Sequence, residues 1–383
     1  MEFEHVTIAL EIVAAAGASN ILAPRRGQPA YARASYHENQ ISSAADMPEP
    51  LFSQSSGKEP GPARQSESHY AYLCRSSRAT MAKCRQLMNT WFVRYPGDAQ
   101  LELRRRISSG DDQQFAAAFF ELYLHELFRC LGYTVEVHPT ATAGRRPDFL
   151  LRARHLPEAY LEAAVSTSKS AKNRAVEARI AAVYDAINSL PSPDFFIWLN
   201  ARGAPASPPP AARFRDTIHG IMASLDVRQQ AALLESSGVD ALPRFHLEHD
   251  GWSLEFFFFP KSESAHGQSD TQPIGVYGSG EAQWVDSRSP LLNTVLKKAS
   301  RYGDLEHPYI IAVNTLGFPL QNIDVMEALF GKEQVTVYFA GDEIHSQELT
   351  RRPDGALTTF SGPRSTRVSA VFHVSTIFPW SVA

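Results

Sequence analysis

FELYLHELFRCLGY (120–133) is the stretch that decides the expected fold, together with RPD (146–148) and YLEAA (160–164), which follow it. Apolar residues at positions 120, 124, 127, 128 and 131 recur at helical spacing. We therefore expect an amphipathic helix that begins at Glu121 and ends at Leu131-Gly132. The order of helix, acid and acid is the clue to chemistry in this chain.

Strand-like periodicity follows this helix. Val135 and Val137 alternate with polar residues over 133–138, and 147–153 and 160–165 read as two more strands. An amphipathic run over 172–190 predicts the next helix, and DFFIWLN (194–200) predicts a buried strand. The expected order is α, β, β, β, α, β.

Prolines in RGAPASPPPAA (202–212) predict an extended joint and a domain boundary near residue 205. Beyond it, 213–236 reads as helical and Asp250-Gly251 marks a hairpin. The stretch 291–314 repeats the helix-then-strand pattern, so its strand either extends the first sheet or belongs to a separate domain. We expect a disordered leader over 1–68, a core over 69–204 and an α+β second half over 205–383.

Composition is that of an ordinary soluble protein. The chain has 383 residues, 44% of them hydrophobic, and a net charge of −4, so any attraction to nucleic acid must be local. Acidic residues near the start oppose a secretory signal, no run approaches a membrane span, and the three cysteines have no metal-type spacing. A cytoplasmic protein without a membrane contact is expected.

The two later acids suit a divalent cation. Magnesium prefers oxygen ligands, commonly one or two carboxylates with water and substrate phosphate. Asp148 and Glu162 supply carboxylates, and the backbone carbonyl of Ala163 can add a third oxygen. Glu162 and Ala164 face the same way on a strand, so position 164 lies nearest the ion. Each acid alone has an ordinary alternative, as a helix-start, turn or surface residue.

Taken together, the pattern resembles the PD-(D/E)XK nuclease superfamily and its Mrr-type members. The resemblance covers about 115–200 and rests on Phe120-Glu121, Gly132-Tyr133, the two later acids and the element order. It implies a restriction-endonuclease-like mixed sheet flanked by helices. It also implies that Glu121 assists the metal site, that Asp148 is the main ligand and that Glu162 is the acid of the (D/E)XK half.

One departure concerns the lysine of that motif, because Ala164 occupies its place. Either the lysine has moved or the site is inactive. Lys169 and Lys172 follow the strand, with Lys172 ahead because it should lie on the first turn of the next helix, and Arg174 is a lesser candidate.

Local charge suits a polyanion. Between 143 and 179 there are eight basic residues and four acids, and Arg145, Arg146 and Arg174 are the expected nucleic-acid contacts. A second basic helix face, formed by Lys297, Lys298 and Arg301, could touch phosphate or could simply be solvated.

The sequence thus predicts an endonuclease that hydrolyses DNA phosphodiester bonds with Mg²⁺ or Mn²⁺, in defence or DNA maintenance, and that can form a homodimer. The alternative is a catalytically inactive nuclease-like protein that binds nucleic acid or serves as a scaffold. A metal cluster of His246, Glu248, His249 and Asp250 is disfavoured, because these side chains would not share one strand face.

Overall fold

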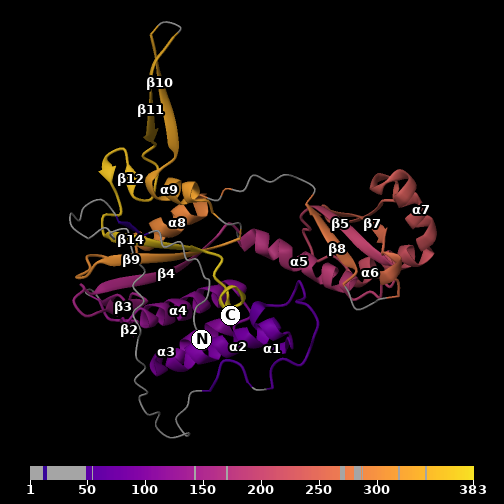
Figure 1. Ribbon diagram of the computed structural model, residues 1–383, viewed down its shortest axis with the longest axis horizontal. Helices are drawn as coiled ribbons and strands as arrows, with labels where there is room; N and C mark the ends of the chain where they lie inside the picture. The colour runs from indigo at the N-terminus through magenta and orange to yellow at the C-terminus, as the bar shows by residue number, and fades with distance from the viewer. Residues whose placement is uncertain are drawn as a thin grey trace. The chain divides into compact units, whose positions relative to one another are not determined.

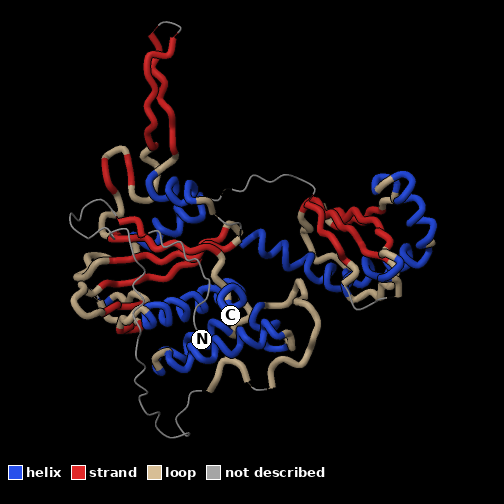
Figure 2. The backbone as a smooth tube through the Cα atoms, in the orientation of Figure 1, coloured by secondary structure: helices blue, strands red, loops and turns tan. Residues whose placement is uncertain are grey.

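The computed structural model describes residues 12–14, 49–53, 55–141, 144–169, 171–267, 272–279, 286, 288–317, 320–340 and 343–383. The chain divides into two compact units. Unit 1 contains Ser68–Ser168 and Asp286–Ala383 together with the described residues before Pro62, and unit 2 contains Pro62–Glu67 and Lys169–Val285. Both are mixed α/β structures in which helices flank mixed sheets (Figures 1 and 2). Among the described helices, none combines the length and the apolar character that crossing a bilayer requires.

Unit 1 is built on a sheet of six described strands. Its elements are β1 (Ile12–Ala14), α1 (His69–Arg75), α2 (Ala79–Arg94), α3 (Gly97–Ile107), α4 (Asp112–Cys130), β2 (Thr134–Val137), β3 (Phe149–Arg152), β4 (Ala159–Thr167), α8 (Arg288–Ala299), β9 (Tyr309–Leu316), α9 (Asn322–Phe330), β10 (Glu333–Ala340), β11 (Glu343–Arg351), β12 (Thr358–Thr359), β13 (Gly362–Pro363), β14 (Val368–Ser375) and α10 (Pro379–Val382).

The strand order is β1-β14-β9-β4-β3-β2. The pairs β2·β3, β3·β4 and β1·β14 are antiparallel, whereas β4·β9 and β14·β9 are parallel. Helices α1 to α4 cover one face of this sheet and α8 and α9 cover the other, as Figure 1 shows. Alternate residues of β4 accordingly join different cores: Leu161 and Ala163 pack on the α4 side, and Tyr160 and Ala164 on the α8 side.

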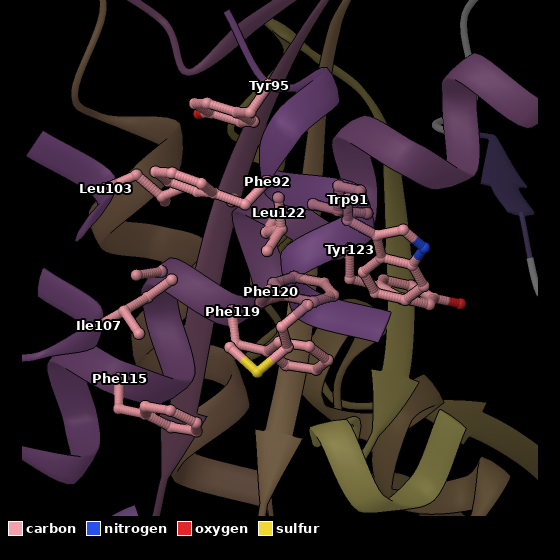
Figure 3. Close-up of a cluster of buried hydrophobic side chains, with 14 of the residues drawn as sticks. Trp91, Phe92, Tyr95, Leu103, Ile107, Phe115, Phe119, Phe120, Leu122 and Tyr123 are labelled. Carbon is pink, nitrogen blue, oxygen red and sulfur yellow. The ribbon is translucent and has the colours of Figure 1, made fainter. Parts of the chain in front are cut away.

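The core on the α4 side is rich in aromatic side chains, which Figure 3 displays. Phe119 stacks on Trp91 at a ring-centroid distance of 6.1 Å, and Phe120 stacks on Tyr123. Both phenylalanines are fully buried, each contributing about 1.5–3 kcal/mol of burial free energy. This packing fixes the helix that carries Glu121.

Unit 2 has its own sheet, with strand order β6-β7-β5-β8. Its elements are α5 (Ala171–Asn188), β5 (Phe195–Gly203), α6 (Ala211–Ser224), α7 (Val227–Ser237), η2 (Val239–Ala241), β6 (Phe245–His249), β7 (Trp252–Pro260), η3 (Glu263–Ala265) and β8 (Ile274–Ser279). The predicted hairpin is confirmed: Asp250 and Gly251 join β6 to β7 with φ of 43° and 78°. Positive φ at both turn residues suits the type I′ turns of two-residue hairpins.

Unit 2 is an insertion between β4 and α8 of unit 1. The strand expected to follow the third strand in the first sheet, β5, lies in the sheet of unit 2. Its place beside β4 is taken by β9, so the possibility that 291–314 extends the first sheet is confirmed. The boundary expected near residue 205 falls inside unit 2, between β5 and α6, because the prolines there join two elements of one unit.

Two local expectations are corrected. The helix expected to begin at Glu121 begins at Asp112, because the side chain of Asp111 accepts the Gln113 and Gln114 amides and caps the helix there.

Most of the leader expected over 1–68 lies outside the described residues. The described part of it is ordered: Leu51 and Phe52 are buried, and the Phe52 amide donates to the Asn89 side chain at 3.0 Å. Disorder is therefore wrong for this part, because its two apolar residues join the α4-side core.

Candidate functional site

Asp148 directly precedes β3, and Glu162 lies on β4, the antiparallel neighbour of that strand. The register of β3 and β4 ends at the pair of Phe149 and Leu161, and Asp148 and Glu162 are the residues adjacent to that pair. Asp148 also accepts a hydrogen bond at Oδ2 from the Ala163 amide, at 2.7 Å. Two like charges close together in a sheet are unfavourable without compensation. The strands therefore create a local concentration of negative charge.

Glu121 adds a third acid from the opposite side of the sheet. It lies in the middle of α4 and is 6% exposed, so it is not the solvated first-turn acid of the ordinary alternative. Arg106 of α3 donates to both of its carboxylate oxygens, with Nη1 at 2.6 Å from Oε1. This two-pronged ion pair compensates a buried charge that would otherwise be costly.

Glu162 is fully buried and is surrounded by cationic and hydroxyl groups. Lys298 Nζ donates to its Oε1 at 2.6 Å, and Arg301 Nη1 donates to the same oxygen. The Tyr302 hydroxyl lies 2.5 Å from Oε2 and 3.2 Å from the Arg146 carbonyl oxygen. All three groups come from α8 or the residues directly after it. The helix that precedes β9 thus supplies the partners of the acid on β4.

The electrostatics show that the three acids interact. Burial and then the charges of Glu121 and Glu162 raise the pKa of Asp148 to about 8, while Lys298 and the Ala163 amide act in the opposite direction. The carboxyl at this position thus holds a proton in the metal-free protein near neutral pH.

A cleft of about 890 Å³ opens above these residues within unit 1. Asp148 and Glu121 line it directly. Its remaining lining is largely cationic or polar on both sides, and includes Glu102, Arg106, Gln113, His138, Arg145, Arg146, Thr294, Lys297, Lys298, Ser300 and Arg301. A cleft lined by both acids and cations can hold a polyanion close to groups that bind a cation.

The structure brings together most of the residues expected at the site. The Ala163 amide donates to Asp148, and the charges of Glu121 and Glu162 both act on Asp148. Arg145 and Arg146 line the cleft, and Arg145 donates to the Arg301 carbonyl oxygen.

The lysines expected after β4 belong to unit 2. Lys169 Nζ pairs with Glu177 at 2.9 Å, Arg174 donates to the Lys169 carbonyl oxygen, and Lys172 is exposed on α5. The expected catalytic roles of Lys169 and Lys172, and the expected nucleic-acid contact of Arg174, remain predictions.

Four residues of the site were not assigned from the sequence: Arg106, Lys298, Arg301 and Tyr302. Lys298 and Arg301 were recognised only as a basic helix face. The available signal was the repeat of helix and apolar strand over 291–314. Because β9 pairs with β4 in parallel, the helix before it, α8, packs against the face of the sheet that carries Glu162. This helix and the residues after it supply Lys298 and Arg301.

The donor chemistry of the site suits a hard divalent cation. Asp148 and Glu162 offer carboxylate oxygens, and the repulsion between Asp148 and both Glu162 and Glu121 is what a cation would relieve. Among the described residues, no three His, Cys, Asp or Glu side chains are grouped as a ready-made metal cage. A cation here would therefore depend on two carboxylates, backbone, water and substrate oxygens, which is how magnesium is commonly held.

Comparisons with known proteins add no relative to this description. No protein-family model matches the chain, and neither the search of curated proteins nor that of solved structures found a match.

Proposed function

We propose that the protein is a metal-dependent nuclease that hydrolyses DNA phosphodiester bonds. The observation that carries the proposal is that Asp148, which lines a cleft rich in cations, lies close enough to Glu162 for their charges to interact, with Lys298 bonded to Glu162. The proposed core is restriction-endonuclease-like, with the order α4, β2, β3, β4, α8, β9, and unit 2 interrupts it between β4 and α8.

In this proposal Lys298 takes the part of the lysine missing at Ala164. Its amine lies 2.6 Å from Glu162, next to the position that Ala164 leaves without a cation. A positive group at this point would stabilise the charge that develops on phosphate during attack by water. Tyr302 and Arg301 would hold Glu162 in place while the amine shifts toward the substrate.

Asp148 and Glu162, with the Ala163 carbonyl, would hold Mg²⁺ or Mn²⁺. Such an ion, when bound, supplies a Lewis acid and lowers the pKa of bound water. Arg145, Arg146 and Lys297 are exposed cations at the cleft and would bind backbone phosphates. Glu121, which is held by Arg106, would reinforce the negative potential that attracts the ion.

The test is cleavage of plasmid and single-stranded DNA by the purified full chain, with Mg²⁺, with Mn²⁺ and with EDTA. We expect metal-dependent cutting that falls on the order of 100-fold in both Asp148→Asn and Lys298→Met, which remove a ligand and a charge-stabilising group. Lys172→Met is the matched control and should cut at the wild-type rate. DNA cleavage that survives Asp148→Asn would rule out Asp148 as a metal ligand. Loss of cleavage in Lys172→Met but not in Lys298→Met would assign the catalytic lysine to α5 instead of α8.

A second candidate is nucleic-acid binding without hydrolysis. The observation that favours it is that both carboxylate oxygens of Glu162 already have partners, Lys298 and Arg301 on one and Tyr302 on the other. Such a carboxylate can serve a purely structural role. This candidate predicts salt-sensitive DNA binding that Arg146→Ala weakens, with no product under any metal condition.

A further inference from the structure

The β10–β11 hairpin of unit 1 is a ribbon of two strands that projects from α9 (Figure 1). Its base is fixed, because the Arg352 amide donates to the Lys332 carbonyl at 2.8 Å and Arg351 Nη1 donates to the Gly331 carbonyl at 3.1 Å. In the two-stranded sheet that the hairpin forms, neither strand has another described strand beside it. A two-stranded ribbon of this kind is marginally stable by itself in water.

One face of this ribbon is apolar and uncovered. The register pairs Val335 with Leu349, Val337 with Gln347 and Phe339 with Ile344, and cross-strand partners share a face. The exposed fractions of the apolar members are 58% for Val335, 68% for Leu349, 36% for Val337, 64% for Phe339 and 64% for Ile344. Together with Gln347, the partner of Val337, these five residues form what we call the apolar face.

The other face of the ribbon is largely polar. It carries the pairs Gln334 with Thr350, Thr336 with Glu348 and Tyr338 with Ser346. Gln334 Nε2 donates to Thr350 Oγ1 at 3.1 Å across the strands, which confirms that these partners share a side. The ribbon is therefore amphipathic, with one face suited to water and the other to burial.

The size of the apolar face is that of an interface core. Its exposed side chains present on the order of 500 Å² of apolar surface, near the upper end for patches on a soluble monomer, and such patches commonly mark interaction sites. Two copies of this face would together bury about 1,000 Å², which approaches the lower limit of specific interfaces before any flanking contact is added.

We propose that two copies of this chain dimerise by packing their apolar faces against each other. None of the six residues of this face is charged, and Glu333 and Arg351 at the base of the same face neutralise each other in an ion pair, so the face has no net charge to attract nucleic acid or a strongly charged partner. Glu348 on the opposite face adds negative charge that repels phosphate. An uncharged apolar face is self-complementary, as a two-fold interface requires.

The one polar residue among these six, Gln347, selects the arrangement. Gln347 lies in the middle pair of the stripe. If the two-fold axis crosses the ribbons at this pair, Gln347 meets Gln347 of the second copy and the two amides bond to each other. An axis parallel to the strands would instead press each amide against Val337, leaving it buried without a partner. The first arrangement also sets Phe339 and Ile344 over the smaller side chains of Val335 and Leu349, the pair nearest the base of the hairpin, in the other copy.

The first test is the mass of the full chain in solution, measured by sedimentation or light scattering over a range of concentrations. We expect a dimer for the wild type and a monomer for Phe339→Lys and for Leu349→Lys. Thr336→Lys and Thr350→Lys, on the polar face of the same ribbon, are matched controls and should remain dimeric. A wild-type monomer at about 100 μM, well above the dissociation constants of specific dimers, would overturn the proposal, as would apolar-face variants that stay dimeric with unchanged melting temperature.

The second test uses a single engineered cysteine. Cys130 is the exposed native thiol among the described cysteines, so the experiment is done in a Cys130→Ser background. Mild oxidation should convert Gln347→Cys to a covalent dimer on a non-reducing gel, whereas Ser346→Cys on the polar face should stay monomeric there. Equal cross-linking of the two variants, or none in Gln347→Cys, would contradict the two-fold arrangement.

Discussion

Replacing Asp148 by Asn should stabilise the metal-free protein, and the gain should depend on pH. The folded carboxyl has its pKa raised from 3.8 to about 8, by burial and by the charges of Glu121 and Glu162. At pH 7 the folded state therefore retains a proton that the unfolded chain has released. Each pH unit across this range costs about 1.4 kcal/mol, so the penalty at pH 7 is about 4 kcal/mol as an upper limit. Asn keeps the shape and can still accept from the Ala163 amide, but it carries no titrating group.

The sign follows from proton binding. Because the folded state binds more protons than the unfolded state between about pH 4 and pH 8, this group makes wild-type stability fall as pH rises through that window. Urea unfolding in EDTA should show Asp148→Asn more stable by about 2–4 kcal/mol at pH 7 and equal to wild type near pH 4. Asp304→Asn, at a side chain that is 96% exposed, is the control and should change stability little at either pH. A destabilised Asp148→Asn at pH 7, or a gain that does not shrink at low pH, would refute the reasoning.

Three further perturbations probe other parts of the structure. Arg106→Ala leaves the buried Glu121 carboxylate without its main partner and should cost about 3–5 kcal/mol in urea unfolding, with partial rescue by adding Glu121→Gln; no rescue would count against the pair. Burial lowers the pKa of His373 to about 4, so its contribution to stability should be lost as pH falls from about 6.5 toward 4; a His373→Gln variant with the same pH profile as wild type would contradict this. Gly331→Ala should lower stability by about 2 kcal/mol or more, because φ is +100° and the new Cβ would lie 1.7 Å from the Arg352 carbonyl oxygen; an unchanged melting temperature would show that the turn can adapt.

Local pattern was enough to find most elements of unit 1 that carry acids. The alternation around Val135 and the apolar run before Glu162 predict β2 and β4, because the periodicity of a strand can be recognised from consecutive residues alone. Asp148 and Glu162 meet because β3 and β4 are neighbours along the chain as well as in the sheet. The start of α4 was missed because its cap, Asp111, lies well before the apolar stripe from which the helix was recognised.

Pairing between distant segments could not be read in the same way. Lys298 lies 136 residues after Glu162, and the whole of the second unit's main segment, Lys169–Val285, separates their two elements. Both β5 and β9 are apolar strands preceded by an amphipathic helix, so periodicity alone gives no preference for either one beside β4. The choice depends on which helix packs over the sheet, and that is a tertiary property. Sequence order favours Lys172 on α5, the next helix along the chain, whereas the cation on Glu162 comes from α8, the helix that packs beside it in space.

In the proposed function, Asp148 and Glu162 hold one divalent cation beside Lys298. Anomalous diffraction from crystals grown with Mn²⁺ tests it most directly, with Asp148→Asn crystals as the control. We predict one manganese peak between the two carboxylates in the wild type, with Lys298 within reach of the bound water or phosphate, and no peak in the variant. Crystals with Mn²⁺ that show no peak there, with Lys298 still bonded to Glu162, would contradict it.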